Sequence, residues 1–126
     1  MKTDTSRCEV TDAADGDEPI DAELIQDSTE SVLTMRLDSS IRADIELKTS
    51  TVVGYLNLLM LKDLGADTDA LVRQMFDKAY ELLDLKKRPR ADTPIFAAFF
   101  YMREVAGLTR RFLWIHTQRS ATDGAR

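Results

Sequence analysis

Residues 94–117, PIFAAFFYMREVAGLTRRFLWIHT, are a long apolar stretch that predicts a helix. Thr93 offers an N-cap, and Pro94 suits the first helical position because that position needs no backbone N–H. At 100° per residue, apolar side chains spread over about 200° of arc, whereas a helix on one core needs little more than 100°. We therefore expect a further surface to cover part of this helix. The apolar arc holds Ile95, Ala97, Ala98, Phe99, Tyr101, Met102, Val105, Ala106, Leu108, Phe112, Leu113 and Ile115.

Two earlier helices are predicted over about 39–64 and about 68–87. Asp38, Ser39 and Ser40 offer N-cap oxygens before the first, and Gly65 follows it as a helix-terminating glycine. Pro89 stops the second helix, so a short linker joins it to the third. The sequence thus predicts an all-α fold of three main helices, with the last two forming an antiparallel hairpin. The expected core positions are Ile41, Ile45, Val52, Leu56 and Leu59 in the first helix and Leu71, Met75, Ala79 and Leu82 in the second.

The N-terminal segment is strongly acidic. Residues 1–31 hold ten acidic and two basic residues, and their main apolar residues are Val10, Ile20, Leu24 and Ile25. Such a composition buries too little apolar surface to offset its ordering entropy. We therefore predict a disordered acidic tail over 1–31, one helical domain over 32–118 and a disordered end over 119–126. The charge is uneven, because residues 86–126 carry nine basic and three acidic residues although the net charge is −5.

The residue content argues against an enzyme. The chain has one histidine, one cysteine and no Gly-rich phosphate loop, so no catalytic, metal-binding or cofactor-binding constellation can be assembled from known motifs. The N-terminus has no apolar signal-peptide core, and the longest apolar runs are far shorter than the roughly 20 residues of a membrane span. We expect a non-catalytic cytoplasmic protein that needs no cofactor and does not enter a membrane.

Arginines alternate with aromatic rings on the side of the third helix that lies outside the apolar arc. Such side chains dominate protein interfaces and also suit single-stranded nucleic acid, although buried rings with extended arginines would give the same pattern. Our leading hypothesis is an adaptor, chaperone or regulator that binds a protein partner and forms a homo-oligomer. The candidate partner-binding residues are Phe96, Phe100, Arg103, Arg110, Arg111 and Trp114.

A second hypothesis comes from residues 31–40, SVLTMRLDSS, where apolar and polar side chains alternate as in a strand. A short strand followed by two helices resembles the ribbon-helix-helix DNA-binding dimers. The resemblance implies that Val32, Thr34 and Arg36 enter the major groove and that residues 67–117 are an added oligomerisation unit. A bend at residues 48–51 would favour this alternative over one continuous helix. DNA would also contact the basic residues Lys86, Lys87, Arg88 and Arg90.

Overall fold

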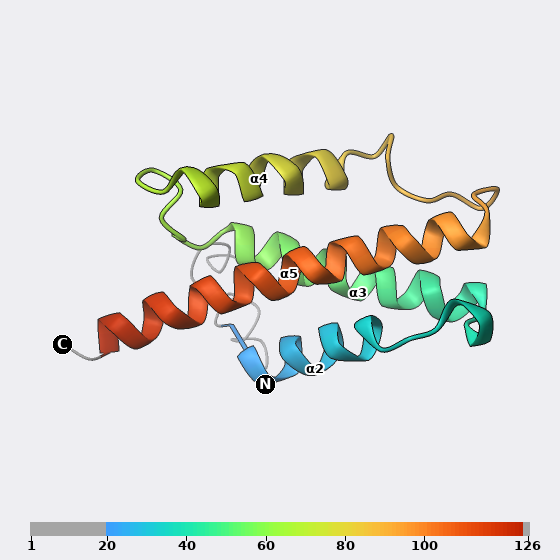
Figure 1. The fold of residues 1–126 in the computed structure, drawn as a ribbon, viewed down its shortest axis with the longest axis horizontal. Helices are drawn as coiled ribbons and strands as arrows, with labels where there is room; N and C mark the ends of the chain where they lie inside the picture. The colour runs from blue at the N-terminus through green and yellow to red at the C-terminus, as the bar shows by residue number, and fades with distance from the viewer. Residues whose placement is uncertain (1–19, 125–126) are drawn as a thin grey trace, which may run out of the picture.

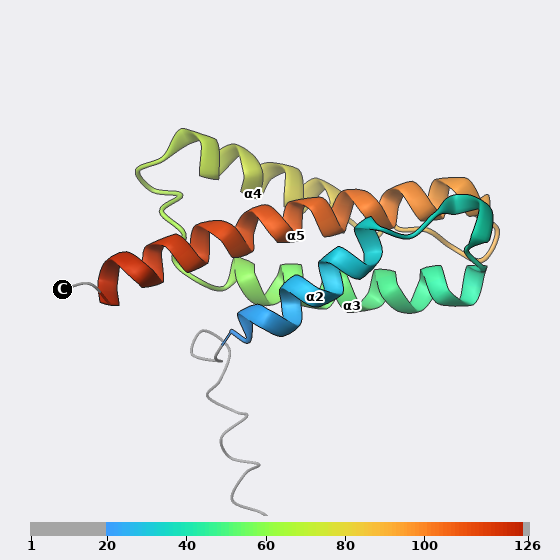
Figure 2. The same ribbon diagram turned by 60° about the horizontal axis from the view of Figure 1, so that its bottom comes forward.

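The computed structural model describes residues 20–124, and the side chains of residues 20–119. Four α-helices make up this part of the chain: α2 (Ala22–Leu33), α3 (Arg42–Met60), α4 (Ala70–Leu83) and α5 (Ile95–Gly124) (Figure 1). A short 3-10 turn, Leu37–Ser39, precedes α3, and residues 20–124 contain no strand. The all-α class is confirmed for this range. Helix α5 runs through the middle, with α2 and α3 on one side and α4 on the other (Figures 1 and 2).

Helix α2 corrects the prediction of a disordered tail over 1–31, which is wrong for residues 20–31. Asp21 caps the helix by accepting a hydrogen bond from the Leu24 amide at 3.1 Å. Ile25, Thr29 and Val32, at helical spacing, are fully buried. One face of α2, with Ile25 and Val32 buried and Ala22 and Leu33 partly buried, therefore provides the apolar surface that the composition of the whole segment concealed. Residues 1–19 of the predicted tail lie outside the described residues.

Helix α2 supplies the cover that the wide apolar arc of α5 requires. α5 packs most extensively on α3 and next on α2. Arg103 of α5 donates a hydrogen bond of 2.7 Å to the Leu33 carbonyl, at the end of α2. Lys48 of α3 donates a hydrogen bond of 3.2 Å to the Ser31 hydroxyl of α2. Because α2 covers this face within the chain, the width of the arc no longer argues for an oligomer.

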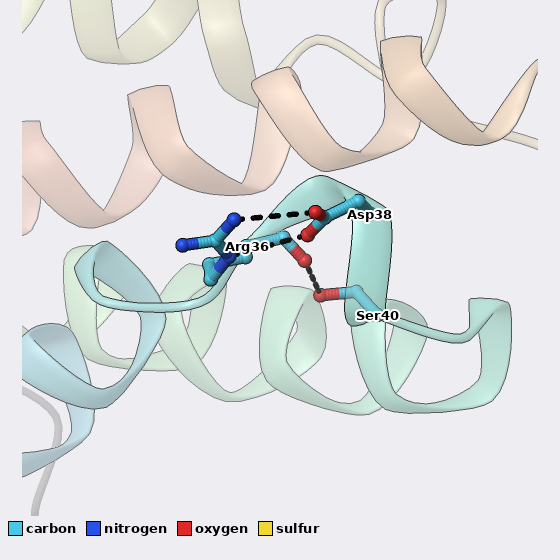
Figure 3. Close-up of polar contacts among 3 residues, drawn as sticks. All are labelled: Arg36, Asp38 and Ser40. Carbon is cyan, nitrogen blue, oxygen red and sulfur yellow. Dashed lines mark hydrogen bonds and ion pairs between the residues drawn. The ribbon is translucent and has the colours of Figure 1, made fainter.

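The residues expected to cap the first long helix instead brace the turn before it (Figure 3). The Arg36 guanidinium donates to both carboxylate oxygens of Asp38 at 3.3 and 3.2 Å, and the Ser40 hydroxyl donates to the Arg36 carbonyl. Helix α3 therefore begins at Arg42, after Ile41, which has no side-chain acceptor to cap it. It ends at Met60 rather than near residue 64.

Helix α3 runs unbroken through residues 48–51. The hydroxyls of Thr49 and Thr51 donate to the carbonyls one turn earlier, those of Ile45 and Leu47, at 2.7 and 3.1 Å. These bonds satisfy the polar side chains without bending the chain. The strand expected over residues 32–37 is also wrong, since Leu33 ends α2 and Val32 is buried. Both structural expectations of the ribbon-helix-helix resemblance therefore fail.

Helices α4 and α5 run in opposite directions (Figure 1). Helix α4 begins after Asp69, whose carboxylate accepts bonds from the Leu71 and Val72 amides at 2.9 and 3.4 Å. It ends at Leu83, four residues before the expected end, so the linker to α5 is longer than predicted. Helix α5 continues to Gly124, which makes residues 119–124 helical instead of disordered, while residues 125 and 126 are not described.

The core follows the predicted helix faces with three exceptions. Ile41, Leu71 and Ile95, all expected inside, are exposed. Ile41 lies before the first turn of α3, and Leu71 projects from the first turn of α4. Fully buried side chains from α2, α3 and α5 form the centre of the core, and α4 adds Val72, Ala79 and Leu82 at its edge. The largest of the fully buried residues is Phe112.

Candidate partner-binding groove

Helix α4 touches the rest of the molecule at few points. Phe76 packs on Phe112 with ring centroids 5.0 Å apart, and the Tyr101 hydroxyl donates to the Leu82 carbonyl. Beside these contacts, three adjoining hollows lie along the boundary between α4 and α5, and neighbouring hollows share lining residues. We call the three hollows together the α4–α5 groove.

The wide end of the groove is a hollow of about 490 Å³ with an apolar floor and two exposed apolar walls. Leu64 and Val72 lie buried at the floor. Trp114 of α5 is 64% exposed, and Leu71 of α4 is 69% exposed. Large apolar side chains exposed on facing walls are typical of a surface that binds an apolar group.

The loop before α4 closes this end of the groove. Gly65 has a φ of 88°, which a residue with a side chain rarely adopts, and its amide donates to the Asp63 carboxylate at 3.1 Å. The Arg119 guanidinium lies over Gly65 and forms an ion pair with Asp63 at 3.7 Å. The glycine therefore lets the loop turn beneath an arginine of α5, where a Cβ would come within 2.7 Å of the guanidinium.

Gly107 lines the middle of the groove and places no side chain in it. A Cβ at this position would meet nothing within 4 Å, so no neighbouring helix packs closely against the backbone here. Lys78 of α4 and Glu104 of α5 form an ion pair across the groove at 3.1 Å. Their hydrogen bond raises the pKa of Lys78, and both side chains are about half exposed. An ion pair this exposed adds little to the stability of the fold, so a bound partner can break it at little cost.

Phe100, which is 57% exposed, lines the far hollow of about 360 Å³. Fourteen residues separate it from Trp114, which corresponds to about 21 Å along a helix. Exposed rings thus stand near both ends of a groove as long as four helical turns. Between them, Arg111 lines both the wide end and the middle, and its side chain has no ion-pair partner among residues 20–119.

The structure brings together four of the six predicted partner-binding residues. Phe100, Arg103, Arg111 and Trp114 line the groove, whereas Phe96 and Arg110 are exposed on α5 without lining it. The Arg103 guanidinium lies 5.9 Å from the Phe99 ring centre and is already engaged with α2. The prediction missed the wall from α4, since Leu71 had been placed in the core.

The seven residues of the DNA alternative lie in two segments of the chain, the end of α2 with the turn after it and the linker after α4. Val32 is buried, and the Thr34 hydroxyl bonds to the last turn of α2. Arg36 is paired with Asp38, and Lys87 is paired with Glu81 at 3.5 Å. Lys86 is exposed in the linker after α4, while Arg88 and Arg90 lie further along it beside the start of α3.

Chemically, the groove offers apolar contact and the Arg111 guanidinium, which has no ion-pair partner among residues 20–119. Within the described residues, no three or more histidine, cysteine or acidic side chains gather as metal ligands. None of the described helices has an apolar run sufficient to span a bilayer. No protein-family model, curated protein sequence or solved structure matches this chain.

Proposed function

We propose that this protein is a non-catalytic helical interaction protein, and that the α4–α5 groove binds an amphipathic helix of a partner protein. The observation that carries the proposal is the pair of exposed rings, Phe100 and Trp114, near the two ends of one groove between helices. A helix that lays its apolar face in such a groove uses anchor side chains spaced by three, four or seven residues.

The charges of the groove indicate which charge the partner helix carries. Its other cations are engaged within the protein: Lys78 with Glu104, Lys87 with Glu81, Arg119 with Asp63, and Arg103 with the Leu33 carbonyl. Arg111 alone lines both the wide end and the middle, and it forms no ion pair with a carboxylate of the described residues. We expect the partner helix to carry an acidic residue between its apolar anchors, because a guanidinium–carboxylate contact fixes the register of an otherwise apolar fit.

The test uses selection from a library of peptides about 20 residues long, followed by affinity measurements on purified variants. We expect the selected peptides to share apolar residues at helical spacing and one acidic residue. Trp114→Ala should weaken their binding at least about 30-fold if Trp114 is a hot spot. Selected peptides that bind Trp114→Ala as tightly as the unaltered protein would refute the proposal.

Two glycines provide a matched pair of variants. Gly107 lines the groove and Gly54 of α3 does not, yet a Cβ at either position meets nothing within 4 Å. Gly107→Gln should obstruct the groove and weaken peptide binding about tenfold or more, whereas Gly54→Gln should leave binding unchanged. Both variants replace a helical glycine by a better helix former, so neither should lose stability. Equal peptide affinity in the two variants would place the binding site elsewhere.

A second copy of the chain is the other occupant to be distinguished. Sedimentation of the unaltered protein and of Trp114→Ala makes the distinction. A monomer in both cases agrees with a groove kept for another protein. A dimer that Trp114→Ala converts to monomer would assign the groove to self-association and overturn the proposal.

A further inference from the structure

A second cavity, of about 310 Å³, lies between the first half of α3, the start of α5 and the linker that joins α4 to α5. Its lining combines three guanidinium groups with an apolar floor. The arginines are Arg42 of α3 and Arg88 and Arg90 of the linker, while Ile45 and Ala98 are buried beneath. We call it the arginine pocket. Its volume is at the lower end of the range for small-molecule sites.

Backbone contacts hold two of the three arginines in place. The Arg42 guanidinium donates to the Thr93 carbonyl at 2.6 Å and so ties the end of the linker to α3. The Nε of Arg88 donates to the Leu83 carbonyl at 3.2 Å. The Arg90 amide donates to the Thr93 hydroxyl at 2.7 Å, and the Arg90 side chain makes no hydrogen bond to residues 20–119. The linker is thus fastened to the body, and every guanidinium keeps donors to spare.

The charge of the pocket is not neutralised within the described part of the protein. No carboxylate of residues 20–119 lies within 4.0 Å of any of the three guanidiniums, although the chain as a whole carries 22 acidic residues. Glu46 is the one acidic residue of the lining. Arg42 lies in the first turn of α3, whose partial positive charge adds to that of the arginines. Three like charges around one cavity repel one another unless an anion lies between them.

We propose that the arginine pocket binds a small organic phosphate. A guanidinium matches phosphate oxygens with two parallel donors, and a phosphate dianion offsets more of this charge than one carboxylate can. Ser50, whose hydroxyl is not engaged by the described residues, provides a further donor at the rim. The apolar floor accommodates the organic part of the ligand. This site is separate from the proposed function of the α4–α5 groove.

The test is a titration of the full-length protein with phenyl phosphate at constant ionic strength, followed by amide NMR shifts. We expect saturable shifts centred on Ser50, Arg90 and Ala91. Arg90→Gln should weaken binding at least about tenfold, as for the loss of a charge-assisted hydrogen bond. This variant suits the test because the Arg90 side chain makes no hydrogen bond within residues 20–119.

Arg110→Gln is the matched control, because it removes the same charge from an exposed position of α5 outside the pocket. We expect its affinity for phenyl phosphate to equal that of the unaltered protein. Equal weakening in Arg90→Gln and Arg110→Gln, or shifts that never saturate, would show diffuse attraction and overturn the proposal. Inorganic phosphate serves as the second probe, and we expect it to bind at least about threefold more weakly. Equal affinities would overturn the organic assignment in favour of the inorganic ion.

Discussion

Val32→Asp should lower the free energy of unfolding by about 3–5 kcal/mol, because it places an unpaired carboxylate in a fully buried position of α2. A loss of this size is a large share of the stability of a domain this small. Urea unfolding followed by far-UV circular dichroism measures it. The result would establish residues 20–33 as part of the folded core.

Leu24→Asp is the control, since Leu24 lies on the same helix but is 50% exposed. It makes the same kind of substitution in the first turn, where a negative charge suits the helix dipole. The expected change is within about 1 kcal/mol. Similar unfolding midpoints for Val32→Asp and Leu24→Asp would contradict the docking of α2 on the core.

The second large effect is expected from Phe112→Ala. Phe112 is fully buried and packs against Phe76 of α4, so truncation leaves a cavity that should cost about 3–5 kcal/mol of unfolding free energy. Trp114→Ala, two residues along the same helix, should cost less than about 1 kcal/mol, because that ring is largely exposed. Chemical unfolding of the two variants side by side gives the comparison.

The comparison between Phe112 and Trp114 bears on the proposed function as well as on the core. If Trp114→Ala proves as destabilising as Phe112→Ala, the indole is packed within the protein and cannot serve as an anchor for a partner. If it leaves stability intact, a loss of peptide binding in the same variant can be attributed to the groove surface.

The angular positions on α5 could be predicted from the sequence. They placed Phe99 and Phe112 in the apolar arc and Phe100 and Trp114 outside it, and the burial of the four rings agrees with that division. The prediction succeeded because α5 is one regular helix, so 100° per residue holds from end to end. The excess width of the arc, from which we expected an unspecified further surface, is accounted for by the packing of α2 on α5.

The identity of that element could not be obtained from composition. The acidic residues of α2 lie on its solvent side, and a count of charges ignores which side of a helix they occupy. The positions of a few residues could have identified α2 as a helix. Asp21 can cap it, and the apolar residues Ile20 and Ile25 flank the cap at the spacing of a hydrophobic staple. Val32 follows Ile25 at a spacing of two turns.

The α4–α5 groove depends on features that no single helix encodes. The periodicity of α4 placed Ala79 and Leu82 inward, as observed, but it also placed Leu71 there. How closely α4 approaches α5 depends on the linker after Leu83, which is fastened to α3 and to the start of α5 by Arg42. These tertiary contacts determine which apolar side chains remain in solvent, and they cannot be derived from helical phase.

The central position of α5 has a consequence for synthesis on the ribosome. Arg103 and Leu33, which join α5 to α2, are 70 residues apart in the sequence. At about 5–20 residues per second, α2 and α3 emerge several seconds before the helix that buries them. Their apolar faces therefore remain exposed to water, or bound to a chaperone, until α5 has left the exit tunnel. The nascent chain therefore completes its core only when its last described helix has been made.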